Sequence, residues 1–159
     1  MPYIIVMKNF NTSDFFTFYE LTKSHDHPEL IKTNREHFSK EPHLTRLIVF
    51  SESTLEEIRF AVNAPVIVTS CGRCPELNGA VGGVKTSQHL FSTPTDGAAD
   101  ITIPGQSVET VAFKIYNHGI RFFQMRVYTK SNFIHIGSPR RKNNIQIYFP
   151  ESTKPGWAK

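Results

Sequence analysis

The sequence predicts an α+β domain in which N-terminal helices pack on a mostly antiparallel sheet. Two observations support this fold class. Apolar residues recur at helical spacing in the N-terminal part, whereas short β-branched and aromatic runs separated by turn residues dominate the C-terminal part. The length of 159 residues suits a single domain, placed at 1–159 with a core at about 41–149 and a tail at 150–159.

Two helical regions are expected before the first strand. A short helix is predicted at 14–23, directly after the capping residues Asn11–Asp14. Residues 24–42 are mostly polar and are interpreted as a surface connection. From 41 to 63 the apolar positions again follow helical spacing, and a capping box at 51–57 marks a second helix start. This region therefore predicts one bent helix or two abutting helices.

Five strands and one further helix are expected in the rest of the chain. Ser107 is a capping residue for a helix at 108–118, which ends at Gly119. The β-branched segment at 65–70 predicts a buried strand, and glycine-rich turn material follows it up to Gly83. The strands are expected at 65–70, 99–103, 121–128, 132–136 and 144–149.

The composition is that of a globular protein and excludes several other classes. Hydrophobic residues make up 39% and charged residues 20% of the chain, which argues against disorder, collagen-like repeats and coiled coils. No apolar run is long enough to span a membrane, and the first residues lack the basic start and cleavage site of a secretory signal. The net charge of +4 is compatible with anionic partners, but no aromatic–basic motif of a nucleic-acid-binding module is present. We expect neither a membrane nor a nucleic acid as partner, and the oligomeric state stays open.

Cys71 and Cys74 are the two cysteines, in the order Cys-Gly-Arg-Cys. This spacing permits a redox pair or half of a zinc site. A four-cysteine zinc site is excluded because the chain has no second pair. We favour the simpler interpretation, in which both are small residues in the turn after a strand.

Two histidines and one aspartate stand out among the residues that can bind a metal. His89 follows the glycine-rich turn, His135 lies in the middle of an apolar strand, and Asp100 begins a strand, where aspartate is disfavoured. Each has an alternative role as a hydrogen-bonded residue of the fold. Together they can supply the three ligands of an open tetrahedral zinc site, with a fourth position left for water. The remaining histidines are expected to be solvated or, for His118, to lie at a helix end.

Five segments follow one another in an order typical of one enzyme family. They are Thr69–Asn78, Ala80–Gly83, Ser87–Leu90, Gly97–Ile101 and Phe133–Ile136. These segments resemble the motifs of the zinc D-Ala-D-Ala carboxypeptidase/endopeptidase family, which cleaves peptidoglycan peptides and includes wall-lytic enzymes of bacteria and phages. The resemblance covers about residues 41–138.

The resemblance implies a zinc ion held by His89, Asp100 and His135. It also implies that Arg73 binds or polarises the substrate carbonyl beside the metal. Zinc polarises a scissile carbonyl and lowers the pKa of a bound water. A guanidinium fork holds a carboxylate or a developing oxyanion at two points, which lysine does less well.

Further site residues are expected around this centre. Ser70 and Gln88 are candidates to hydrogen-bond the residues that hold the metal and so orient them. Alternatively, they are simply polar residues of a strand end and a turn. Asn132, which precedes the last motif, is assigned to substrate binding. With these additions the predicted fold is an α+β domain whose sheet carries a zinc site.

The chain departs from the family pattern at the general base. Family members usually carry an acidic residue close to the last zinc histidine, where this chain has Asn132 and Gly137. No Asp or Glu occurs between positions 110 and 150. The candidates for the catalytic role are Asp96, in a loop that is longer than usual for the family, Glu76 and His118, of which Asp96 and Glu76 are preferred.

The resemblance implies a zinc-dependent peptidase that hydrolyses peptide bonds of bacterial cell-wall peptidoglycan, as a D,D-carboxypeptidase or an endopeptidase of endolysin type. The alternative is a catalytically weak or inactive zinc-containing protein of the same fold that binds the wall or belongs to a virion. Without a secretory signal, we expect a phage-encoded or virion-associated protein that acts at the wall, and otherwise a cytoplasmic one. The basic stretch Arg140–Lys142 is interpreted as a solvated turn rather than a grip on an anionic polymer.

Overall fold

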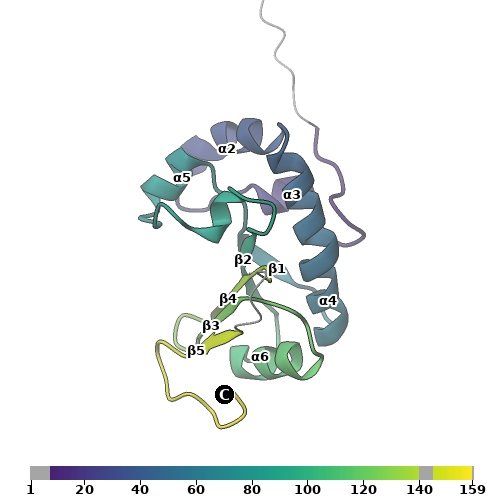
Figure 1. The fold of residues 1–159 in the computed structure, drawn as a ribbon, viewed down its shortest axis with the longest axis vertical. Coiled ribbons are helices and arrows are strands. Elements are labelled where there is room, and N and C mark those ends of the chain that lie inside the picture. The colour runs from purple at the N-terminus through teal and green to yellow at the C-terminus, as the bar shows by residue number, and fades with distance from the viewer. Residues whose placement is uncertain (1–7, 140–144, 159) are drawn as a thin grey trace, which may run out of the picture.

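The computed structural model describes residues 8–139 and 145–158. The helices are α1 (Phe18–Leu21), α2 (Ile31–Phe38), α3 (His43–Phe50), α4 (Glu56–Val62), α5 (Pro75–Ala80) and α6 (Val108–Asn117). The strands are β1 (Ile67–Ser70), β2 (Ala98–Thr102), β3 (Gln124–Tyr128), β4 (Phe133–Gly137) and β5 (Gln146–Tyr148). The sheet has the order β1-β2-β4-β3-β5, and neighbouring strands are antiparallel except for the parallel pair β3 and β5. The predicted α+β class with a mostly antiparallel sheet is confirmed (Figure 1).

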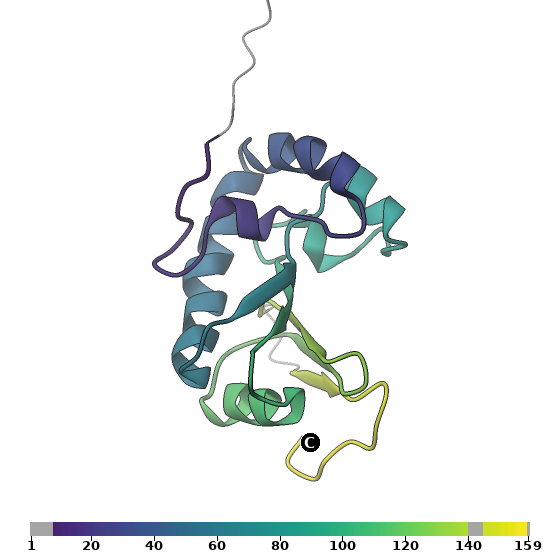
Figure 2. The ribbon, with the colours of Figure 1, turned by 180° about the vertical axis from the view of Figure 1, so that it is seen from behind.

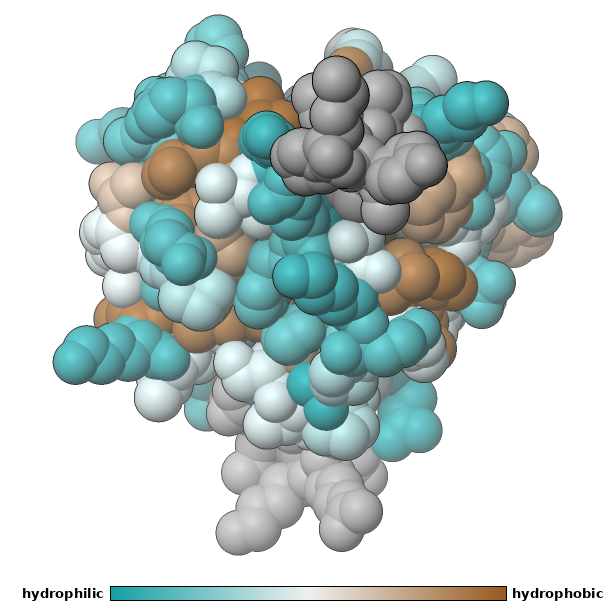
Figure 3. Space-filling view, turned by 90° about the horizontal axis from the view of Figure 1, so that it is seen from above, coloured by the Kyte–Doolittle hydropathy of each residue, from teal (hydrophilic) through white to brown (hydrophobic). Residues whose placement is uncertain are grey.

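The sheet separates an apolar core from a polar face. α6 packs against β3 and β4, whereas α2 and α5 lie at the opposite end of the molecule (Figure 1). Ile101, Ile134 and Ile136 are almost fully buried in the core. Because side chains alternate along a strand, Asp100 and His135, which neighbour these isoleucines in sequence, point to the other face. The end with α2 and α5, seen from above, presents polar and apolar residues side by side (Figure 3).

The region 41–63 forms one continuous helical segment rather than two separately capped helices. α3 passes into α4 through a wide π-helical turn, Ser51–Leu55. The predicted capping box does not form, because the helix continues through this stretch and none begins there. Ser51 is fully buried in the π-helical turn, and its hydroxyl group has partners elsewhere. It hydrogen-bonds the hydroxyl groups of Thr12, at 3.0 Å, and Ser13, at 2.7 Å. This pairing fixes the N-terminal segment against the long helix.

The helix predicted at 14–23 is confined to α1, and its cap is Thr17 rather than an earlier residue. The Glu20 N–H donates to the Thr17 hydroxyl at 3.3 Å, and the Thr17 N–H donates to the Glu20 carboxylate at 2.9 Å. The residues before it fold back on themselves, with the Thr12 N–H donating to the Phe16 carbonyl at 2.8 Å. α1 itself lies beside β1 (Figure 2).

Residues 24–42 are more than a surface connection, because they contain α2. The Asn34 side chain is fully buried and hydrogen-bonds backbone groups of the segments before and after β1. Its amide donates to the carbonyls of Thr22 and Gly72, each at 2.9 Å, and its oxygen accepts the Cys74 N–H at 2.7 Å. α2 is thereby tied to the loop that follows β1.

The first strand differs from the prediction in its burial. β1 is an edge strand, in which Val68 is buried whereas Ile67 and Thr69 are exposed. The segment predicted as turn material up to Gly83 also contains the short helix α5. The other predicted strands are confirmed within a few residues of their expected ends.

The C-terminal helix is confirmed together with both of its ends. The Thr110 N–H donates to the Ser107 hydroxyl at 3.2 Å, and Gly119 has the positive φ of 78° that follows many helices. Arg140–Lys142 lies outside the described residues. Within 8–139 and 145–158, none of the helices has the length and apolar character that crossing a membrane would need.

Candidate metal centre

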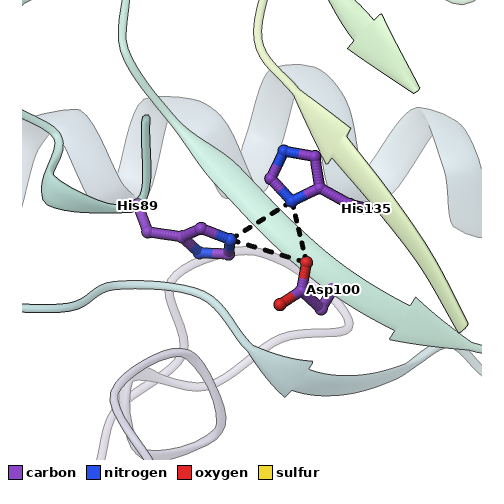
Figure 4. A group of neighbouring side chains, drawn as sticks. All are labelled: His89, Asp100 and His135. Atoms are coloured by element: carbon purple, nitrogen blue, oxygen red, sulfur yellow. Dashed lines mark hydrogen bonds and ion pairs between the residues drawn. The ribbon is translucent and has the colours of Figure 1, made fainter. Parts of the chain in front are cut away.

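Three side chains from separate elements converge on the polar face of the sheet (Figure 4). Asp100 of β2 and His135 of β4 are directly paired in the antiparallel register, and His89 approaches from the short 3₁₀ helix Gln88–Leu90. His135 Nδ1 lies 2.8 Å from Asp100 Oδ1, and His89 Nε2 lies 3.3 Å from His135 Nδ1 and 3.5 Å from Asp100 Oδ1. All three ligand atoms lie within 4.8 Å of one another. The structure therefore brings the three predicted ligands together.

The separations of these atoms fit a tetrahedral zinc ion. Zn–N and Zn–O bonds of ~2.0–2.2 Å in a tetrahedron place neighbouring ligand atoms about 3.3 Å apart. The observed separations of 2.8, 3.3 and 3.5 Å bracket this value. Two imidazole nitrogens and one carboxylate oxygen are also a ligand set that zinc favours.

The tautomer of His89 prepares its Nε2 for a metal. The Nδ1 of His89 lies 2.7 Å from the Cys71 carbonyl oxygen, which only accepts, so this nitrogen carries the proton. Burial lowers the pKa of His89 by more than Asp100 raises it, and the side chain is 3% exposed. With the proton on Nδ1, Nε2 is the ring nitrogen that faces Asp100 and is free to act as a metal ligand.

The Asp100 carboxylate is ionised and joins the metal ligands to Arg73. Burial raises the pKa of Asp100, but the interactions with His89 and His135 outweigh it and hold the pKa well below the ordinary value for aspartate. The second carboxylate oxygen accepts a hydrogen bond from Arg73 Nη2 at 3.0 Å. Such an outer partner orients a ligating carboxylate.

Arg73 is held in place by two further interactions. Its Nε donates to the Ser70 hydroxyl at 2.9 Å, and its backbone N–H donates to the His89 carbonyl at 2.8 Å. Burial lowers the pKa of Arg73 and Asp100 opposes this, so the guanidinium stays charged. Ser70 therefore acts through Arg73, as a positioning residue.

A groove passes over this centre. It consists of two adjoining hollows of about 640 and 560 Å³ that share Arg73, Val81, Asp100 and Phe133. The larger hollow extends to the loop with His25 and Asp26, whereas the other is lined by both ligand histidines and by β3. An extended peptide can therefore lie across the three ligands.

Gln88 packs against Gly137, one of the two positions where the family pattern has an acidic residue and this chain has none. Its Nε2 donates to the Ser138 carbonyl at 3.4 Å, and its end packs on Gly137. A Cβ added at position 137 would overlap the Gln88 Oε1 and lie 2.9 Å from its Cδ. Asn132 lies in the turn between β3 and β4 with a φ of 57°, outside the residues that line the groove.

We predict that Gly137→Ala destabilises the protein by about 1–3 kcal/mol, because the buried Gln88 side chain has to move. The added change Gln88→Ala is expected to remove most of this cost. Urea unfolding of the two single variants and the double variant measures the coupling between the positions. Additive effects of the two changes would contradict the packing described above.

The two acids predicted as bases lie elsewhere. Asp96, in the loop before β2, lines neither hollow of the groove, and Glu76 is exposed on α5 near Cys74 and His37. Of the described carboxylates, Asp26 and Asp100 line the groove.

Several residues that line the groove were not among the predicted site residues. They are His25, Asp26, Arg126 and Tyr128. A polar loop and an exposed strand position carry no signal of their own, so only the folded arrangement brings these residues to the site.

Both cysteines are free and buried, as expected for small residues of a turn. Burial raises the pKa of the Cys71 thiol, so it stays protonated. The Cys71 carbonyl, rather than its sulfur, takes part in the site through His89.

Comparison with known proteins gave one match. The family model for peptidase M15 matches residues 17–137, a range that includes all three ligands and Arg73. No curated protein and no solved structure matches the chain.

Proposed function

Because the chain belongs to the peptidase M15 family, whose members are zinc-dependent metallopeptidases, we propose that it hydrolyses peptide bonds of bacterial cell-wall peptidoglycan. One observation carries the proposal. His89, Asp100 and His135 converge at a groove beside a fixed arginine, and their spacing suits zinc.

The residues of the chain have distinct tasks in this reaction. His89, Asp100 and His135 would hold zinc, which supplies Lewis acidity to the scissile carbonyl and to water. Arg73 stabilises the negative charge that develops on the carbonyl oxygen, because its guanidinium is already oriented by Ser70 and Asp100. Little reorganisation is then needed during the reaction.

Asp26 is the group we assign to proton transfer. It lines the same hollow as Arg73 and Asp100, in a stretch that also holds His25. Asp96 and Glu76 lack this placement. A positioned carboxylate of this kind contributes about 10²–10⁴-fold to hydrolysis.

The direct test is hydrolysis by the zinc-loaded protein. Wall fragments are incubated with it at about pH 6 to 9, and new free termini are identified by mass spectrometry. We expect cleavage that a chelator abolishes and added zinc restores. Absence of cleavage, with one zinc bound per chain, would overturn the enzyme assignment.

A second candidate function is wall binding without hydrolysis, within a phage-encoded or virion-associated protein. It is favoured by the absence of an acid at positions 132 and 137. Retention of the zinc-loaded protein on insoluble wall without released peptides would support it. Asp26→Asn separates the two, since it cripples an enzyme and leaves a binder unchanged.

A further inference from the structure

Arg126 lies next to the candidate metal centre but takes no part in it. It is paired with His135 in the antiparallel register of β3 and β4. Side chains at such positions share one face of the sheet, with their Cβ atoms about 5 Å apart. Arg126 accordingly lines the same hollow as His89 and His135, and its side chain is exposed there.

Among the described residues, the guanidinium of Arg126 has an aromatic partner and no acidic one. It lies over the Tyr148 ring, 5.3 Å from the centroid. In the described part of the chain no carboxylate forms an ion pair with it. The charge is therefore available to an anion that enters the groove, because stacking on a ring leaves the N–H edges of a guanidinium free.

Arg126 differs in this respect from the other arginine of the groove. Arg73 already donates hydrogen bonds from its Nε to Ser70 and from its Nη2 to Asp100. It is fixed beside the metal ligands, where the scissile carbonyl belongs. Of the two described arginines that line the groove, Arg126 is the one available to recognise a second, permanently charged group of the substrate.

We propose that Arg126 binds the terminal α-carboxylate of the substrate peptide, so that the protein releases single C-terminal residues as a carboxypeptidase. This inference rests on the proposed function. The placement supports it, because Arg126 lines the hollow that also holds His89 and His135 and lies on the strand next to His135. A peptide that ends one residue beyond the scissile bond would bring its carboxylate into this hollow, whereas a longer leaving segment would place an uncharged peptide group there.

The test compares two peptides that differ only at this carboxylate. N-acetyl-Lys-D-Ala-D-Ala is used as the free acid and as the C-terminal amide. For the zinc-loaded protein, we expect kcat/KM to be about 10–100-fold higher for the acid, as for a charge-assisted hydrogen-bonded pair. Arg126→Gln should remove this preference by slowing cleavage of the acid alone, and Arg126→Lys should retain part of it.

Arg59→Gln is the matched control. Arg59 also lies over an aromatic ring, that of Phe15 at 4.7 Å, but outside the groove. This variant is expected to keep the full preference for the acid. Thermal unfolding of all variants verifies that they fold.

Binding gives a readout that does not depend on catalysis. Calorimetry with both peptides in the presence of a chelator measures their affinities without hydrolysis. Tighter binding of the acid that is lost in Arg126→Gln supports the inference even where no cleavage occurs, a result that counts against the proposed function alone. Equal affinity and equal cleavage of acid and amide, or a preference that survives Arg126→Gln, overturns it.

Discussion

Replacing Asp100 by asparagine is expected to lower zinc affinity and peptidase activity by at least about a hundredfold, since even outer partners of zinc ligands contribute 10–100-fold. The amide keeps the shape of the carboxylate, so Arg73 retains one acceptor at this position. It loses the negative charge that lies 2.8 Å from His135 and 3.0 Å from Arg73. The site then carries one more positive charge than before, which opposes a divalent cation.

Zinc content after dialysis and the Kd from competition with a chelator measure this effect. Glu76→Gln is the matched control, because Glu76 is an exposed carboxylate outside the groove. It should bind zinc as the unchanged protein does. Full zinc occupancy in Asp100→Asn would show that the three residues do not act as a common metal site.

Arg73→Ala is expected to reduce kcat by about 10²–10³-fold, the usual cost of losing an oriented donor to a developing oxyanion. Zinc content should fall far less, because Arg73 contacts the ligand Asp100 and is not itself a ligand. Arg73→Lys restores the charge without the fork and should recover only part of the rate.

Ser70→Ala tests whether catalysis depends on the orientation of the Arg73 guanidinium as well as on its charge. The Ser70 hydroxyl accepts the Nε–H of Arg73 at 2.9 Å, so its loss loosens the guanidinium and leaves the charge in place. We expect a smaller decrease in kcat than for Arg73→Ala and little change in the double variant Ser70→Ala/Arg73→Ala beyond the Arg73 effect. Steady-state kinetics with measured zinc content test both statements, and independent, additive losses would contradict the coupling.

The metal ligands were predictable from the sequence because each stands where its residue type is unusual. Asp100 and His135 interrupt apolar strands, and the strands themselves follow from β-branched runs. The resemblance to a known family then assigned these residues to one site. The proposed base could not be predicted in the same way, since Asp26 lies in a polar loop that resembles any solvated segment.

The errors in the predicted fold have physical causes. α2 was missed because its buried side rests on Asn34 and Phe38, so the segment is too polar to show an apolar stripe. The capping box at 51–57 does not form because the π-helical turn Ser51–Leu55 continues the helix, with Ser51 buried against Thr12, a residue far away in the chain. Tertiary contacts decide both cases, and local patterns do not reveal them.

The ligands lie far apart in sequence, and His89 and His135 are separated by 46 positions. An unfolded chain cannot hold them at 3 Å spacings, so ion uptake and folding are thermodynamically linked. Free zinc at about a hundred times its dissociation constant would add about 2.7 kcal/mol to the unfolding free energy. The melting temperature should consequently rise with zinc activity and drop when a chelator is added, and resistance to proteolysis should report the state of loading.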